Sequence, residues 1–217
     1  MRMRRKKHRE ERLAACSEFL FSAGEEPLEA PLSTFDIPLE KVFLEIGCGK
    51  GGFSCRMAEI NSNAGYYAME RATDCLVLAA EKAKSGEFGE LKNIRFINDN
   101  ADNLESIFAP GTIDAIFLNF SDPWPKSGYA KRRLTHRRYL GMYMRLLKSG
   151  GTLTFKTDND GLFDFSLEEV EAMSIPLVAM TRDLHASEYN EGNVMTEYET
   201  AFSEKGKNIN MMKIKKA

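Results

Sequence analysis

The residues most suited to chemistry begin with a glycine-rich segment, Glu45–Gly52, which reads E-I-G-C-G-K-G-G. The glycines of this segment directly follow a short apolar run, Val42–Ile46, and precede a stretch with helical periodicity. Glycine permits backbone conformations with positive φ and leaves no side chain between the main chain and a ligand. At the amino end of a helix, such a loop can hold a nucleotide-like molecule against backbone N–H groups. The segment therefore predicts a ligand-binding loop between a strand and a helix.

Two fingerprints that differ in their ligand fit this segment. Gly47, Gly49 and Gly52 match the G-x-G-x-x-G pattern of dinucleotide enzymes. The E-x-G-x-G-x-G loop of methyltransferases is matched as well, by Glu45, Gly47, Gly49 and Gly51. The glycines alone do not separate the two. Glu45 favours the methyltransferase interpretation, because a carboxylate there can bind the ammonium of a methionine moiety but would repel a pyrophosphate.

Three further residues are suited to hold the rest of a nucleoside. Glu70 follows the second apolar run, where Rossmann-like proteins place an acid that accepts hydrogen bonds from both ribose hydroxyls. Asn100 and Ala101 follow the third run and offer a side-chain amide and a backbone N–H to the edge of an adenine ring. A plain turn would use the same two residues. Both cofactor interpretations share these candidates.

A second motif, N-F-S-D-P-W-P-K at 119–126, follows the most apolar run of the chain. Its two prolines fix φ on either side of Trp124 and stiffen the segment. In such a loop Trp124 can stack on a base, Asp122 can accept a hydrogen bond from that base, and Lys126 can meet a phosphate. The alternative is a rigid turn whose tryptophan fills the core. The motif predicts a nucleoside-gripping loop.

The order of the apolar runs predicts the elements that position these motifs. From about Lys41 onward, short apolar strands alternate with helical stretches, which is typical of a parallel sheet with helices on both faces. Ligands of such folds bind at the carboxyl edge of the sheet. We expect strands at 42–46, 66–69, 94–97, 114–120, 152–155, 177–180 and 198–202, and helices from 52, at 73–84, at about 134–148 and at 163–173.

Charge and proline distribution predict the domain organisation. Residues 1–40 read as a basic arm and an irregular approach segment, and residues 41–217 as one domain. Although the formal net charge is only −2, basic residues cluster at 2–9, 131–138 and 213–216. Such clusters can form a phosphate-binding face, whereas solubilising tails and solvated helix faces have the same composition.

Composition also argues against several classes of protein. The four cysteines show no paired spacing, so neither a disulfide framework nor a zinc site is indicated, and no metal requirement is visible. No run approaches the roughly 18 apolar residues that cross a bilayer, and no signal peptide is indicated. We therefore expect a cytoplasmic protein without a membrane partner, either a monomer or a homodimer.

The chain resembles the bacterial tRNA (guanine-N7)-methyltransferase family through motifs at 45–51, 119–126, 131–135, 157–159 and 196–199. The string S-D-P-W-P-K at 121–126 is the most specific, because methyltransferases acting on exocyclic amines usually carry an Asn/Asp-Pro-Pro-aromatic string instead. The resemblance implies an α/β, Rossmann-like class I methyltransferase fold with a seven-stranded, mostly parallel sheet. It also implies S-adenosyl-L-methionine as donor and a guanine in the tRNA variable loop as acceptor.

By matched position, the resemblance also implies roles for individual residues. Asp122 is the implied catalytic residue and, like Glu45 and Glu70, an implied cofactor contact. The full set of candidate cofactor contacts is Glu45, Gly47, Gly49, Gly51, Glu70, Asn100, Ala101 and Asp122. The candidate substrate contacts are Lys126, Lys131, Arg132, Arg133, Asp158, Thr196, Glu197, Tyr198 and Glu199.

This chain departs from the family at two places. Ser127–Ala130 replaces further basic residues and a histidine, and Asn100 stands where many relatives carry aspartate. The first departure bears on how tightly the loop holds RNA. The second keeps a hydrogen-bond acceptor but loses a charge, so we expect it to affect the affinity for the donor.

Guanine N7 carries a free lone pair and no proton, so methylation there needs alignment rather than a general base. A fixed carboxylate such as Asp122 could stabilise the positive charge that moves to the purine. A carboxylate could also accept from the N1–H and the exocyclic amine of guanine together. Asp158 and Glu199 are both candidates for this contact, and Asp158 could instead cap the helix that follows it.

Three other functions compete with this interpretation. A nicotinamide-dependent oxidoreductase would use the same glycines and Glu70, but the chain offers no separate substrate domain and no obvious proton donor. A non-catalytic RNA-binding module would keep the fold without the chemistry, which the intact Glu45, Asp122 and Asp158 argue against. A methyltransferase for another base or for a protein would keep the donor site and change only the acceptor.

Overall fold

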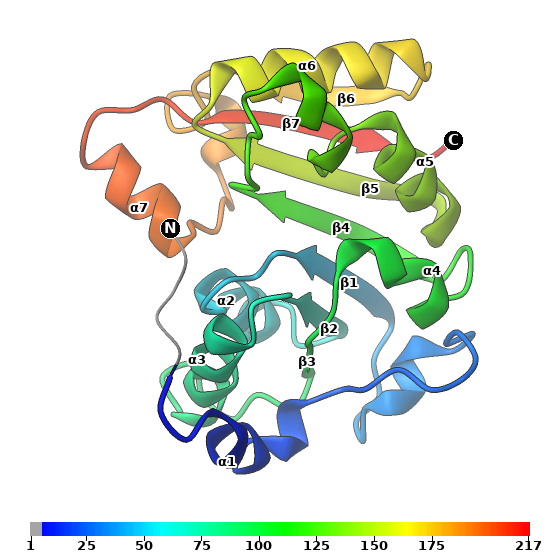
Figure 1. The fold of residues 1–217 in the computed structure, drawn as a ribbon, viewed down its shortest axis with the longest axis vertical. Coiled ribbons are helices and arrows are strands. Elements are labelled where there is room, and N and C mark those ends of the chain that lie inside the picture. Colours follow the sequence, from blue (N-terminus) through cyan, green and yellow to red (C-terminus); the bar gives the residue numbers. More distant parts are fainter. Residues whose placement is uncertain (1–5) are drawn as a thin grey trace. The chain divides into compact units, whose positions relative to one another are not determined.

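The computed structural model describes residues 6–217, so the part of the amino-terminal basic cluster at 2–5 lies outside the described residues. The chain divides into two compact units, residues 1–109 and residues 110–217. The strand order is β3-β2-β1-β4-β5-β7-β6, with the first three strands from the first unit and the other four from the second (Figure 1). The predicted seven-stranded α/β fold is confirmed.

The first unit is built on three parallel strands, β1 (Lys41–Ile46), β2 (Ala64–Met69) and β3 (Ile94–Ile97). Helix α2 (Gly52–Ile60) connects the first two strands, and α3 (Thr73–Lys84) connects the second pair. Every residue of β2 is buried, as expected of a central parallel strand covered on both faces. The predicted strands and the helix at 73–84 are therefore confirmed within one or two residues.

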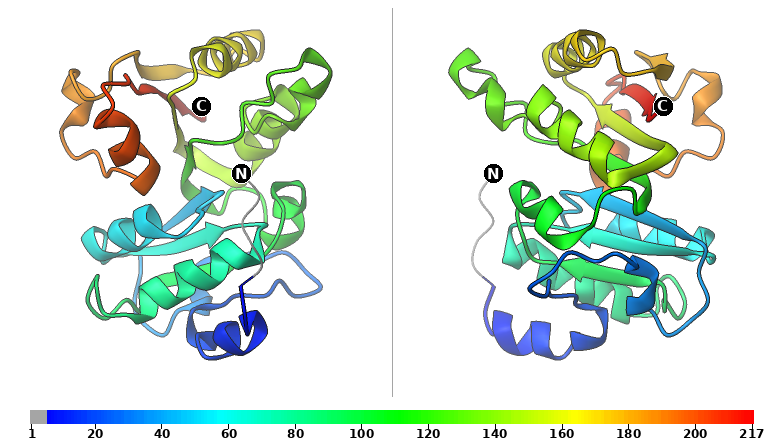
Figure 2. Two further views of the ribbon diagram at one scale, coloured as in Figure 1. Left: turned by 60° about the vertical axis from the view of Figure 1, so that its left-hand side comes forward. Right: turned by 90° about the vertical axis from the view of Figure 1, so that its right-hand side faces the viewer.

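The segment before β1 folds more than its composition predicts. Helix α1 (Arg9–Ala14) packs on α3 (Figure 2). The guanidinium of Arg12 donates twice to the carboxylate of Glu81, each time at 2.7 Å. Short 3-10 turns follow at Ser17–Phe19 and Pro31–Thr34. Leu20 forms a bridge to β3 through Phe96. Charge pattern alone missed this packing, because a few buried apolar side chains anchor an otherwise polar segment.

The first unit ends with a 3-10 turn at Ala101–Asn103 and the short helix α4 (Leu104–Ile107). Phe108, directly after this helix, forms an isolated β-bridge with Leu28. The end of this unit therefore pairs with the segment at 25–40, which the sequence predicts to be an irregular approach to the domain.

The second unit combines parallel and antiparallel pairing. Strand β4 (Ile113–Asn119) pairs in parallel with β5 (Leu147–Thr157), and β5 pairs antiparallel with β7 (Asn210–Lys215). Strand β6 (Leu177–Thr181) is antiparallel to β7. The connections contain α6 (Asp160–Ala172), α7 (Glu197–Ser203) and 3-10 turns at Ser127–Arg132 and Glu188–Asn190.

One strand prediction is wrong. Residues 198–202 lie in helix α7, and the last strand is β7, where the sequence showed mainly a basic cluster. Thr196 and Glu199 form a capping box, in which the side chain of each residue bonds the backbone N–H of the other, and this motif starts a helix. Strand β7 carries lysines at its end, but Met212 and Ile214 are fully buried and anchor it in the sheet.

Helix α5 (Arg137–Leu146) is shorter than the predicted helix at about 134–148, because it begins after its N-cap His136 and β5 begins at Leu147. The side chains of Tyr139, Tyr143 and Leu146 on this helix are buried. This helix and α6 both pack against β5. Within residues 6–217, every helix is too short or too polar to cross a bilayer.

We predict that Gly51→Ala destabilises the protein more than Gly86→Ala does. Both glycines have positive φ, 75° and 79°, so the backbone strain is similar. A Cβ at Gly51 would lie 2.7 Å from the Cβ of Ala79, whereas a Cβ at Gly86 meets nothing within 4 Å. The difference in the free energy of unfolding should be about 1–3 kcal/mol, measured by urea denaturation. Equal destabilisation by the two substitutions would contradict close packing at Gly51.

Candidate functional site

The glycine loop after β1 adopts the left-handed conformation that its sequence predicts. Gly47, Gly49 and Gly51 have φ values of 85°, 56° and 75°. Gly51 precedes α2 and packs against α3, which accounts for its lack of a side chain. Around Gly47 and Gly49 there is open space, because an added Cβ would meet nothing within 4 Å. The main chain of these two residues is therefore accessible to a ligand.

Glu45 is the last but one residue of β1 and is only 2% exposed. Its carboxylate accepts a hydrogen bond from the hydroxyl of Ser54 on α2. Burial and the carboxylates of Glu45 and Glu70 raise the pKa of the Cys48 thiol well above its usual range. Cys48 therefore stays protonated inside the loop and does not compete for a cationic ligand.

Glu70 stands at the carboxyl end of β2 and is fixed by the backbone. Its two carboxylate oxygens accept from the N–H of Gly49 at 3.1 Å and from the N–H of Ala72 at 2.7 Å. A carboxylate has about four acceptor positions, so two stay available for ligand hydroxyls. Glu70 thus links the glycine loop to the start of α3 and still fits the predicted contact with a ribose.

Sequence inspection missed Asn98, which holds the main chain beside Glu70. Its amide donates to the carbonyl of Glu70 at 2.8 Å, and its side-chain oxygen accepts from Thr73 at 2.8 Å. The side chain of Asn100, by contrast, is bonded within the local turn. It accepts a hydrogen bond from the N–H of Asp102 and donates one to the carboxylate of Asp102. Ala101 is buried in that turn. Asn98 could have been noticed as the first polar residue after the third strand.

The motif after β4 is held in a strained conformation. Phe120 and Trp124 have φ values of 52° and 40°, which residues other than glycine rarely adopt. Such strain persists only where surrounding contacts hold the backbone, and it concentrates at functional sites. Arg133 supplies two of these contacts, since its guanidinium donates to the carbonyls of Pro123 and Trp124, each at 3.0 Å. The motif is therefore rigid, as its prolines predict.

An aromatic and cationic surface borders this motif. The rings of Trp124 and Tyr129 meet edge to face at 5.9 Å, and the guanidinium of Arg132 lies over both, at 5.0 and 4.7 Å. Lys126 and Lys131 are exposed beside them. Arg133 is different, because its guanidinium bonds the motif and stacks on Phe165 at 4.3 Å. Tyr129 was not among the predicted residues, although aromatic and basic residues alternate here.

Asp158 follows β5 and forms an ion pair with Lys207 at 2.9 Å. This hydrogen bond raises the pKa of Lys207, so the ammonium stays charged. Burial and the nearby charge of Asp158 together raise the pKa of Tyr198, so the phenol stays neutral. The cap of α6 is Asn159, whose side chain accepts from the N–H of Leu162 at 2.8 Å. Asp158 is therefore not the helix cap and keeps its carboxylate for other partners.

Glu199 is enclosed rather than exposed. Its carboxylate accepts from Lys156 at 2.6 Å, Asn193 at 2.8 Å and His185 at 2.9 Å, and its relative exposure is 0%. Burial opposes its ionisation, but the charge of Lys156 and these hydrogen bonds outweigh burial and lower the pKa of Glu199. With its oxygens occupied and buried, Glu199 has no acceptor position left for guanine.

The rest of the predicted 196–199 segment splits between structure and surface. Thr196 is buried as the cap of α7, with its hydroxyl accepting from the N–H of Glu199 at 2.9 Å. Glu197 and Tyr198 are exposed. Lys156 and His185, which hold Glu199, were not predicted. A lysine within the apolar run of β5 was the available signal, since a buried charge requires a partner.

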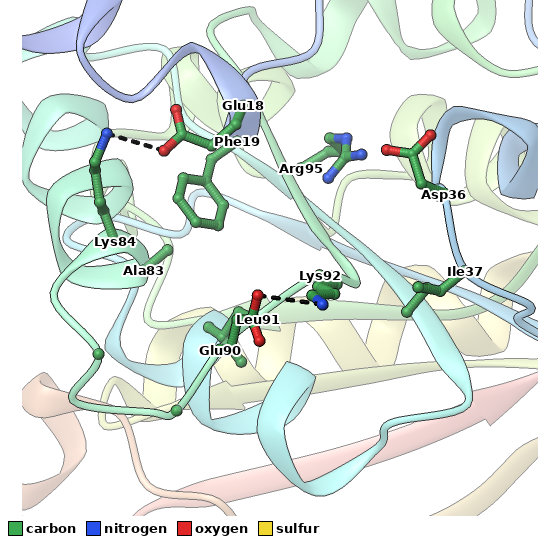
Figure 3. A pocket seen from close by; sticks show the side chains of 12 residues that line it. Glu18, Phe19, Asp36, Ile37, Ala83, Lys84, Glu90, Leu91, Lys92 and Arg95 are labelled. Atoms are coloured by element: carbon green, nitrogen blue, oxygen red, sulfur yellow. Dashed lines mark ion pairs between the residues drawn. The ribbon is translucent and has the colours of Figure 1, made fainter.

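A separate hollow of about 700 Å³ lies in the first unit, and none of the predicted site residues lines it (Figure 3). Two of its lysines are paired with carboxylates, Lys84 with Glu18 at 2.9 Å and Lys92 with Glu90 at 3.2 Å. The guanidinium of Arg95, also on its lining, bonds the carbonyl of Thr34 at 2.8 Å. Its cations are therefore engaged within the protein. Among residues 6–217, no group of three metal-ligating side chains gathers, and none of the four cysteines forms a disulfide.

Comparison with known sequences gives a consistent result. The model of a family described as "Putative methyltransferase" matches residues 39–212. A tRNA (guanine-N(7)-)-methyltransferase of Mesoplasma florum is 43% identical over 222 residues, covering 100% of this chain and 99% of its own length. The enzyme of the same name from a Geobacillus species is 41% identical, covering 99% of this chain and 96% of its own length.

Solved structures share the fold at low identity. A structure of a 16S rRNA methyltransferase, KamB, has a TM-score of 0.64 at 11% identity and covers 88% of this chain and 95% of its own. An antibiotic-related methyltransferase has a TM-score of 0.63 at 16% identity and covers 90% of this chain and 98% of its own. These likenesses support a class I methyltransferase fold.

The charge of Glu199 predicts a pH dependence of stability. Its pKa is lowered by folding, so its stabilising effect is complete above the unfolded value of about 4.3 and is lost as the pH falls through the folded-state pKa. We expect Glu199→Gln to be less stable than the unchanged protein at pH 7, with a gap that narrows below about pH 4. Urea unfolding at several pH values measures this gap. Glu171→Gln, on the exposed surface of α6, is the control, and a pH-independent gap for Glu199→Gln would contradict the ion pair.

Proposed function

Because this chain belongs to the tRNA (guanine-N(7)-)-methyltransferase family, we propose that it transfers a methyl group from S-adenosyl-L-methionine to N7 of a guanine in the variable loop of tRNA. The observation that carries this proposal is the match of the entire chain to relatives of that activity. We place the enzyme in the cytoplasm, because its substrate is tRNA.

The donor site consists of the open glycine loop and two carboxylates of the first unit. The main chain of Gly47 and Gly49 faces open space, so an adenosyl group can approach it without meeting side chains. Glu70 is anchored by two backbone N–H groups and keeps acceptor positions for both ribose hydroxyls. Glu45 supplies the negative charge for the ammonium of the methionine moiety. The bound cofactor supplies an electrophilic methyl group on a sulfonium.

Asn100 and Ala101 are the remaining residues of the proposed donor site. Because the side chain of Asn100 is engaged in its turn, we assign the adenine edge to the backbone of this segment rather than to the amide. Asn98, which bonds the carbonyl of Glu70, keeps the ribose-binding acid in place. We therefore expect Asn100, at a position where many relatives carry aspartate, to change the affinity for the donor less than the loss of a charge alone would.

Asp122 is the proposed catalytic residue in the second unit. Guanine N7 has an in-plane lone pair, so the protein does not need to remove a proton and must instead align the nucleophile. Positive charge develops on the purine during transfer, and an exposed, rigidly held carboxylate can stabilise it. The strained backbone at Phe120 and Trp124 on either side of Asp122 fixes the direction of this carboxylate.

Asp158 is the residue that we assign to the Watson–Crick edge of guanine. Its carboxylate is polar and partly accessible, whereas that of Glu199 is buried and fully engaged. Accepting from N1–H and the exocyclic amine together would contribute roughly 1–3 kcal/mol of discrimination between bases. Lys207 donates a hydrogen bond to one oxygen of Asp158 at 2.9 Å. Tyr198, which is exposed near Asp158, packs its ring against Phe120 and Phe202 instead.

The tRNA backbone is assigned to the exposed basic residues around the motif. Lys126, Lys131 and Arg132 are exposed and available to phosphates. Tyr129 adds a stacking surface at the segment where relatives carry basic residues. Arg133 instead holds the proposed catalytic loop, because its guanidinium donates to the carbonyls of Pro123 and Trp124. Positive charge lost at 127–130 is thus partly replaced by stacking.

Asp122→Ala should lower the rate of tRNA methylation by about 100- to 1,000-fold, because it removes charge stabilisation that acts mainly in the transition state. The measurement uses labelled S-adenosylmethionine and unmodified bulk tRNA, followed by nucleoside digestion and chromatography. Label should appear in 7-methylguanosine for the unchanged protein. S-adenosylhomocysteine binding should fall only modestly.

The matched control for this substitution is Asp164→Ala. Asp164 is an exposed carboxylate of the same unit that pairs with Arg182, and such surface pairs contribute about 0–1 kcal/mol. An unchanged rate for Asp122→Ala would remove Asp122 from the catalytic role. Label in a nucleoside other than 7-methylguanosine would keep the donor site and overturn the acceptor.

Lys131→Ala should weaken tRNA binding and make it less sensitive to salt. Removing one phosphate contact lowers the slope of log affinity against log salt by about 0.7–0.9. Filter binding over a range of potassium chloride concentrations measures this slope. Lys92→Ala, a surface lysine of the first unit that pairs with Glu90, should leave the slope unchanged. A slope that Lys131→Ala does not alter would place the RNA backbone elsewhere.

A further inference from the structure

Phe120 begins the catalytic motif in a backbone conformation that its neighbours must hold. Its φ of 52° is unfavourable for a residue with a Cβ. Its N–H donates to the carbonyl of Lys156 at 2.9 Å, and its side chain packs on a buried apolar cluster formed by Leu184, Ile209 and Met211. On its other side, its ring lies 4.9 Å from the ring of Tyr198. Asp122 follows only two residues later, in the same strained segment between Phe120 and Trp124.

Tyr198 is placed by helix α7. The helix has seven residues, and its only buried side chain is that of Glu199. Tyr198 stacks on Phe202 of the same helix at 4.1 Å, which stiffens its ring. The position of the Tyr198 ring against Phe120 therefore depends on where Glu199 is held.

Lys156 holds Glu199 and Phe120 at the same time. Its ammonium donates to Glu199 at 2.6 Å, to the carbonyl of Val194 at 2.9 Å and to Asn193 at 3.1 Å, so all three of its N–H groups are used. Its main-chain carbonyl accepts from Phe120. One residue of β5 thus ties the start of the catalytic motif to the helix that supports it.

His185 closes the network from the opposite side. Its Nε2 lies 2.9 Å from Glu199, and this nitrogen must carry a proton because a carboxylate can only accept. Its Nδ1 lies 3.0 Å from the hydroxyl of Ser203 at the end of α7. That hydroxyl in turn donates to the carbonyl of Glu199 at 2.9 Å. The helix is therefore held at both ends by groups that meet at one carboxylate.

We propose that Lys156, Glu199 and His185 are positioning residues for methyl transfer, which fix α7 so that Tyr198 supports Phe120 and thereby aims Asp122. This inference rests on the proposed role of Asp122. It assigns Glu199 an indirect effect on the reaction and not a contact with guanine. Because misalignment by about 1 Å can cost about 100-fold in rate, a small shift of α7 is enough to be felt.

The test compares Glu199→Gln, Tyr198→Ala and Tyr198→Phe in the full chain. Glu199→Gln keeps the volume and removes the charge, while Tyr198→Ala removes only an exposed ring and leaves the buried network intact. Both should lower kcat by about 10- to 100-fold, with little change in the affinity for S-adenosylhomocysteine. Tyr198→Phe keeps the ring and should retain most of the activity. The double variant should be no worse than the poorer single one, because both changes act through the same contact.

A second readout does not depend on activity. Trp124 is the single tryptophan of the chain and lies in the catalytic motif, so its fluorescence reports on that loop. Its emission and its quenching by acrylamide should change in Glu199→Gln and Tyr198→Ala but not in Tyr198→Phe. Glu204→Gln, an exposed acid directly after α7, is the matched control for charge.

Several results would overturn the inference. These are a raised KM for tRNA with unchanged kcat in Glu199→Gln, equal damage by Tyr198→Phe and Tyr198→Ala, or unchanged Trp124 emission in all variants. If the unchanged protein formed no 7-methylguanosine, the proposed function would fail. The positioning of the loop by α7 would then be decided by the Trp124 emission alone.

Discussion

Parallel strand pairing is the constraint from which each half of this protein follows. In a parallel pair, both strands end at the same edge, so the loops after them lie together. In the first unit this edge carries the glycine loop after β1 and Glu70 after β2. In the second unit it carries the Asp122 motif after β4 and Asp158 after β5. The antiparallel strands of the second unit complete the sheet and bring no predicted carboxylate to that edge.

The acids of the second unit divide by their surroundings rather than by their residue type. Asp122 is exposed on a stiff loop and suits a developing charge, whereas Glu199 is buried and neutralised by Lys156. A buried carboxylate with all its acceptor positions used contributes to geometry, because exchanging its partners for a ligand would leave another charge unpaired. Exposure and hydrogen-bond partners therefore distinguish these two carboxylates, although both belong to the same unit.

The departure at Ser127–Ala130 changes the kind of surface offered to RNA. Tyr129 and Trp124 form an aromatic pair under the guanidinium of Arg132. Stacking on such a surface depends less on salt than phosphate contacts do, since it releases no counterions. Arg133, although part of the same basic run, turns inward and stabilises the loop. A cluster of like residues in the sequence thus separates into exposed cations and one that holds the loop.

The sequence by itself determined the alternation of strands and helices, the glycine loop and the order of the functional motifs, because periodicity and glycine content act over short distances. It did not determine the last strand, since Tyr198–Phe202 has strand-like composition but is started as a helix by Thr196 and Glu199. It could not separate Asp158 from Glu199 as the reader of guanine. Only the tertiary structure decided that the carboxylate of Glu199 is buried and paired, because Lys156 and His185, which are 43 and 14 residues away in the chain, converge on it.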